Sequence, residues 1–72
     1  MKRVILCFDI PVEKNTLRVR IWRHLQKLGA ELKMSSYWTL SFSDRNLTDI
    51  KSICKDIKEN GGKAEIIVGE IA

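Results

Sequence analysis

The spacing of apolar residues changes along the chain, and each change predicts a different element. Residues 3–10 read RVILCFDI, a continuous run of β-forming residues that suits a central strand. Ile10 stands before Pro11, which favours extended geometry and ends that strand in a loop. From Leu17 to Leu28 the apolar residues recur at helical spacing, so this stretch predicts an amphipathic helix.

The second half of the chain repeats this alternation of periods. AELKM, residues 30–34, predicts a short strand, and SYWTLSF, residues 36–42, alternates cleanly between two faces. Ser35 and Ser36 are expected to form the turn between these strands. KAEIIVGEI, residues 63–71, predicts the last strand. The segment between the strands at 36–42 and 63–71 predicts a second amphipathic helix. Its apolar residues at helical spacing are Leu47, Ile50, Ile53, Cys54 and Ile57.

Polar residues and glycines mark the ends of both helices. Asn15 or Thr16 is expected to cap the first helix, and Asn46 the second. Gly29 and the NGG segment at 60–62 are expected to end them, because glycine accepts the left-handed conformation at a helix C-terminus.

The order of elements is therefore β-α-β-β-α-β, the split βαβ arrangement of a ferredoxin-like fold in the α+β class. Residues 1–72 are expected to form a single domain, since a chain of 72 residues has room for one core. Right-handed crossovers place both helices on one face of a four-stranded antiparallel sheet. Ile5 and Cys7 then point to the uncovered face. Such an apolar sheet surface marks an interface, and a second copy packed against it about a two-fold axis predicts a homodimer.

Composition narrows the setting. The chain is 44% hydrophobic and 31% charged, which is typical of a folded domain, and no apolar run approaches the ~18 residues of a membrane span. Asp9 and Pro11 interrupt the apolar start, so we do not interpret it as a signal peptide and expect a cytoplasmic protein without a membrane partner. Cys7 and Cys54 lack metal-ligand spacing and are expected to be buried thiols.

Positive charge is concentrated in the first helix. The formal net charge is +4, and between positions 14 and 33 six Lys or Arg residues accompany one acid. The helix contributes Arg18, Arg20, Arg23 and Lys27. One basic element on a mixed surface favours nucleic acid, either RNA or DNA, as the partner. The alternative is that these charged side chains only make an exposed face of the helix soluble and bind no partner.

Asp9 is the one acid at the end of the first strand. In a dimer whose two-fold axis passes nearby, the two Asp9 carboxylates and water would form a site for Mg²⁺. Such an ion could support hydrolysis of a phosphodiester while the arginines hold flanking phosphates. The simpler alternative is an acid that hydrogen-bonds the turn before Pro11.

The remaining aromatic residues and the sole histidine favour packing roles. Trp38 and Phe42 lie on the core face of their strand, and the glycine- and aromatic-rich signature of base-stacking RNA-recognition modules is missing. Trp22, on a helix flank, is a candidate interface residue, whereas the role of Tyr37 is left open. His24 is expected to pack at the edge of the buried stripe.

The segments VILCFDIP, RVRIWRHLQKLGA and SSYWTL together resemble the CRISPR-associated protein 2 family. The resemblance implies a ferredoxin-like homodimer that acts in spacer acquisition beside the CRISPR integrase, a Mg²⁺-dependent endonuclease that cuts RNA or DNA, or both. By position, Asp9 matches the metal-binding and catalytic acid, and Arg18 or Arg20 matches the arginine of the helix. Ser36 and Tyr37 match an accessory serine-aromatic motif.

A second resemblance leads to a different function. RVRIWRHLQKLGA followed by GGKAEI is similar to the N-terminal domain of chromate-resistance regulators, and phenylacetate-pathway repressors contain a related domain. This resemblance implies a non-enzymatic module for dimerisation or regulation. Asp9 favours the CRISPR type, and the Trp22-Arg23 pair favours the chromate type.

Overall fold

The computed structural model describes residues 1–70 and contains four strands and two helices. Their bounds are β1 Lys2–Asp9, α1 Asn15–Lys27, β2 Glu31–Lys33, β3 Tyr37–Ser41, α2 Asp44–Glu59 and β4 Lys63–Glu70. The order is the predicted β-α-β-β-α-β. The last predicted strand extended to Ile71, which lies outside the described residues.

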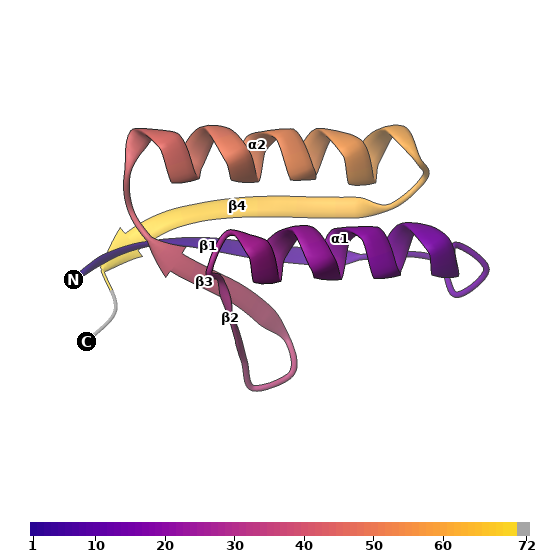
Figure 1. Cartoon of the computed structure of the whole chain (residues 1–72), viewed down its shortest axis with the longest axis horizontal. Coiled ribbons are helices and arrows are strands. Elements are labelled where there is room, and N and C mark those ends of the chain that lie inside the picture. The colour runs from indigo at the N-terminus through magenta and orange to yellow at the C-terminus, as the bar shows by residue number, and fades with distance from the viewer. Residues whose placement is uncertain (71–72) are drawn as a thin grey trace.

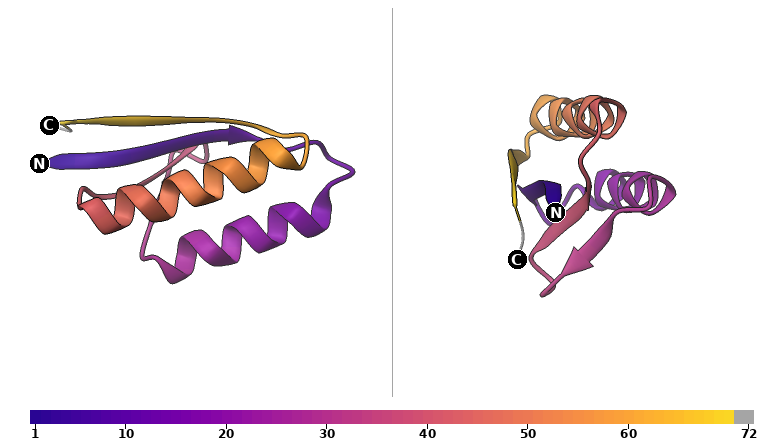
Figure 2. Two further views of the ribbon diagram at one scale, coloured as in Figure 1. Left: turned by 90° about the horizontal axis from the view of Figure 1, so that it is seen from above. Right: turned by 90° about the vertical axis from the view of Figure 1, so that its left-hand side faces the viewer.

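The four strands form one antiparallel sheet in the order β2-β3-β1-β4. Figure 1 shows α1 and α2 side by side along the sheet, and the view from above in Figure 2 shows that both cover the same face. The predicted ferredoxin-like α+β fold is therefore confirmed. The other face of the sheet has no element over it within residues 1–70.

The core lies between the sheet and the two helices. Alternate residues of β1 supply it, and Val4 and Leu6 are completely buried while Ile5 and Cys7 are partly exposed on the other face. Each fully buried aliphatic side chain of this kind stabilises the fold by about 1.5–3 kcal/mol. Trp38 is buried and Phe42 packs against the same cluster, so the prediction that both belong to the core is confirmed.

The helix caps differ from those expected. The residue before α1 is Lys14, which makes no capping side-chain bond, and Asn15 already lies inside the helix. At α2 the cap is Ser43, whose Oγ accepts a hydrogen bond from the Asn46 backbone N at 3.0 Å. The prediction of Asn46 as the cap was wrong because α2 begins one turn earlier than its apolar stripe. Its side chain instead donates to the Ser41 carbonyl at 2.8 Å.

The turn between β2 and β3 begins one residue earlier than predicted, at Met34. Met34 and Ser35 both have positive φ angles, 52° and 55°, and the Ser36 N–H donates to the Lys33 carbonyl at 3.0 Å. Glycine and asparagine adopt this left-handed conformation far more readily than methionine or serine. The antiparallel register, with Leu6 opposite Trp38, places Ser35 and Ser36 near the end of β1.

Two packing predictions need correction. Cys54 is buried, but Cys7 is only partly so because its strand has an uncovered face; both are free thiols. His24 is exposed rather than packed. The buried stripe of α1 is completed by Leu17, Ile21 and Leu25, which leaves His24 on the flank that borders α2.

Candidate nucleic-acid interface

Asp9 lies exposed at the C-terminal end of β1, on the uncovered face of the sheet, and is the register partner of Lys63 on β4. The described chain shows no hydrogen bond or ion pair to its carboxylate. The following turn is closed instead by the backbone, with the Lys14 N–H donating to the Pro11 carbonyl at 2.9 Å. The alternative that Asp9 hydrogen-bonds this turn is therefore not what the structure shows.

A glycine brings the turn after α2 against the end of β1. A Cβ at Gly62 would stand 2.6 Å from Ile57 Cγ2 and 3.0 Å from the Asp9 carbonyl oxygen. No larger residue fits there without displacing one of these groups. The sequence predicted the NGG segment only as the end of the helix, and Gly62 in addition allows the turn after α2 to approach the Asp9 backbone closely.

A magnesium site would need two copies of the chain. Within residues 1–70 no group of three potential ligands among His, Cys, Asp and Glu lies close enough to hold a metal ion. Each copy would supply one carboxylate, Asp9, at the end of a strand on the open face. Carboxylate oxygens with retained water are the ligand set that Mg²⁺ prefers, so the chemical type of this residue is compatible with the predicted role, which stays a prediction.

The four cations of α1 do not form one group. Arg20 binds Asp56 of α2 through two nitrogens: Nη2 lies 2.9 and 3.0 Å from the two carboxylate oxygens, and Nε lies 3.3 Å from Oδ2. Asn60 also donates to Asp56, at 3.0 Å from Oδ1. Arg20 therefore joins α1 to α2, a role that sequence analysis did not identify.

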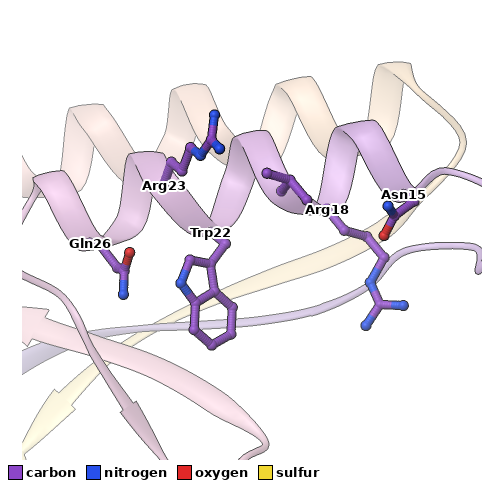
Figure 3. Close-up of a pocket in the computed structure, with 6 residues that line it drawn as sticks. Asn15, Arg18, Trp22, Arg23 and Gln26 are labelled. Atoms are coloured by element: carbon purple, nitrogen blue, oxygen red, sulfur yellow. The ribbon is translucent and has the colours of Figure 1, made fainter.

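Arg18, Arg23 and Lys27 make no ion pair with any group in the part of the chain that the structure describes. Figure 3 shows Trp22 extending from α1 toward the strands and Arg23 extending on the opposite side of the helix. The Arg18 side chain extends from the same side of α1 as Trp22. The unpaired cations thus reach both flanks of one exposed helix.

On the α2 flank, the basic residues line a shallow hollow of about 570 Å³. Its lining residues are Arg20, Arg23, His24, Lys27, Leu28, Arg45 and Asp49. Arg45 comes from the first turn of α2 and was missed from sequence, because charge counting along one helix cannot show which residue of another helix faces it. Both helices therefore supply positive charge to this hollow.

On the strand flank, Arg18 and Trp22 line a second hollow of about 220 Å³ against the β2–β3 hairpin. The other residues that line it are Phe8, Leu32, Ser35, Ser36 and Trp38. Of the predicted accessory pair, Ser36 borders this hollow. Tyr37 lines a different hollow with Arg3 and Thr39, so the structure separates the two residues.

The open face of the sheet is polar at one end and apolar in the middle. Arg3 lies across it: its Nε donates to Thr39 Oγ1 at 3.2 Å, and its Nη1 to Ser41 Oγ at 3.4 Å. Thr39 is buried beneath it, only 1% exposed. Ile5 and its register partner Ile67, which is 49% exposed, form the apolar part beside Cys7.

No model of a known protein family matches the sequence, and no curated protein is significantly similar to it. No helix formed by residues 1–70 combines the length and apolar character needed to cross a membrane.

Three features of residues 1–70 indicate where a functional site could lie. They are the free Asp9, the unpaired cations of α1 and the uncovered sheet face.

Proposed function

We propose that the chain is a homodimeric, nucleic-acid-binding protein of the CRISPR-associated protein 2 type, with α1 as its phosphate-binding element. The observation that carries the proposal is that Arg18, Arg23 and Lys27 extend from one exposed helix without ion-pair partners within residues 1–70. A cation that is not already paired can bind a phosphate without first losing a carboxylate. Arg20 differs because Asp56 already occupies its guanidinium.

The dimer in this proposal forms through the uncovered face of the sheet. Ile5 and Ile67 lie side by side there as register partners, with Cys7 next to them on β1. A second copy related by a two-fold axis would remove these apolar side chains from water. It would also bring the uncovered faces that carry the two Asp9 residues together.

The finer part of the proposal concerns chemistry. The Asp9 carboxylates of the two copies would hold Mg²⁺, which when bound polarises a phosphodiester and activates a water molecule. Arg18 and Arg23 bind phosphates farther along the nucleic acid, away from the scissile bond, because α1 covers the face of the sheet opposite to Asp9. The product is cleaved RNA or DNA, and the biological setting is spacer acquisition beside a CRISPR integrase.

One observation favours a second candidate function. Lys63 is the register partner of Asp9, so a cation on the neighbouring strand can balance the carboxylate without any metal. In that case the chain is a non-enzymatic dimerisation or regulatory module, related to chromate-resistance or phenylacetate-pathway regulators. It would still bind nucleic acid through α1.

Fluorescence anisotropy with labelled RNA and DNA oligonucleotides, paired with light scattering on the same samples, tests the proposal. We expect binding that weakens as salt rises, and a molar mass of two chains. A single-chain mass, or binding that does not change with salt, would contradict the proposal.

A further inference from the structure

The hollow between α1 and the β2–β3 hairpin combines an exposed indole with a free guanidinium. Trp22 is 47% exposed, although tryptophan usually buries most of its large apolar surface. Nothing in the fold requires this exposure, since the core is closed beneath it by Trp38, which is 5% exposed. The exposed ring is therefore available to a ligand.

The indole of Trp22 is held in place rather than free in solvent. Its ring centroid lies 5.2 Å from that of Trp38, with the two planes at 88°, the edge-to-face geometry that aromatic pairs prefer. A ring already fixed by such a contact loses little conformational entropy when a second flat ring stacks on it. Trp22 is thus a preorganised platform for a planar group.

Polar groups surround this platform. Arg18 lies one helical turn before Trp22, borders the same hollow and has no ion-pair partner within residues 1–70. From the opposite side, the tight turn at Met34 and Ser35 presents Ser35 and Ser36. Serine hydroxyls and an arginine are the donors that phosphate oxygens accept from.

We infer that this hollow, defined by Arg18, Trp22, Ser35 and Ser36, binds one unpaired nucleotide, with the base stacked on Trp22 and its phosphate on Arg18. A base can reach the indole only when it is not stacked inside a duplex, so the site selects single-stranded over double-stranded nucleic acid. This inference rests on the proposed function, because it takes nucleic acid as the partner. To the proposed function it adds the class of substrate, single-stranded nucleic acid, and the residue that recognises the base, Trp22.

The test compares an oligothymidine with a duplex of the same length, each fluorescein-labelled, by anisotropy at one salt concentration. Wild-type protein is expected to bind the single strand more tightly. Trp22→Ala is expected to weaken single-strand binding about tenfold and to leave duplex binding within about twofold. Val12→Ala is the matched control, because Val12 is also exposed but lines no hollow with Arg18 or Trp22; it should change neither affinity.

A second variant separates stacking from folding. Trp22→Phe keeps an aromatic face, so single-strand affinity should largely be retained, while the quenching of tryptophan fluorescence by oligothymidine should fall sharply because only Trp38, which is 5% exposed, remains. Equal loss of single-strand and duplex binding in Trp22→Ala, or quenching of wild-type amplitude in Trp22→Phe, would overturn the inference and leave the proposed function standing. Absence of wild-type binding to either nucleic acid would overturn both. A change in molar mass in Trp22→Ala, with unchanged affinity, would identify Trp22 as a protein contact and also overturn it.

Discussion

Arg20 and Asp56 form a bidentate ion pair that joins α1 to α2, with nitrogen–oxygen distances of 2.9 and 3.0 Å from Nη2. Among the cations of α1, Arg20 thus connects the two helices, whereas Arg18, Arg23 and Lys27 have no ion-pair partner within residues 1–70. A row of positive residues in a sequence therefore need not act as one binding surface.

Arg20→Ala is expected to lower the free energy of unfolding by about 0.5–1 kcal/mol, because both side chains are partly solvent-exposed and screening weakens the pair. Chemical denaturation of Arg20→Ala, Asp56→Ala and the double variant forms a cycle that isolates this interaction. Additive losses would show that the contact contributes nothing. Nucleic-acid affinity should fall less in Arg20→Ala than in Arg23→Ala.

The cap of α2 gives a second stability prediction. Ser43→Ala removes the acceptor for the Asn46 N–H and should cost about 1 kcal/mol of stability, whereas Ser43→Asp should preserve it. Asn15→Ala on α1 is the matched control, since no side-chain cap exists there. If Ser43→Ala unfolds at the same temperature as the wild-type protein, the assignment of Ser43 as the cap is wrong.

The fold was predictable from sequence because the period of its apolar residues is local information. Leu17, Ile21 and Leu25 recur at helical spacing whatever surrounds them, and Pro11 marks the end of β1. The caps were not predictable to the residue, because both Ser43 and Asn46 are good capping residues and only the backbone at Ser43 decides between them.

The candidate site was less accessible to sequence reasoning for a related reason. Arg20 is paired because the packing of α1 beside α2 brings it to Asp56, which is 36 residues away along the chain. The contact of Trp22 with Trp38 and the separation of Ser36 from Tyr37 likewise depend on how strands and helices pack. The exposed position of Asp9 at the end of β1 was predictable because a lone acid that ends an apolar strand is a local signal.

Ile67→Lys tests the proposed dimer. The substitution places a charge in the apolar part of the open face, and we expect the molar mass measured by light scattering to fall to that of one chain. Val68→Lys is the matched control, because Val68 is similarly exposed but is the register partner of buried Val4, on the helix-covered face. A mass unaffected by Ile67→Lys would exclude this face as the dimer interface.

Asp9→Asn tests the proposed chemistry. Cleavage of labelled RNA or DNA in the presence of Mg²⁺ should be lost, because the amide cannot supply a charged ligand, while mass and thermal stability stay those of wild type. EDTA should have the same effect on the wild-type protein. Cleavage by Asp9→Asn at the wild-type rate would remove Asp9 from catalysis, and no cleavage by wild type with intact binding would favour the regulatory alternative.

The salt dependence of binding tests most directly whether the free cations of α1 contact phosphates. With one labelled oligonucleotide, the slope of log affinity against log salt should be shallower by roughly one for Arg18→Ala and again for Arg23→Ala. Lys51→Ala, which removes the same charge from an exposed position of α2, should leave the slope unchanged. If all three variants retain the wild-type slope, α1 is not the phosphate-binding element and the central claim is wrong.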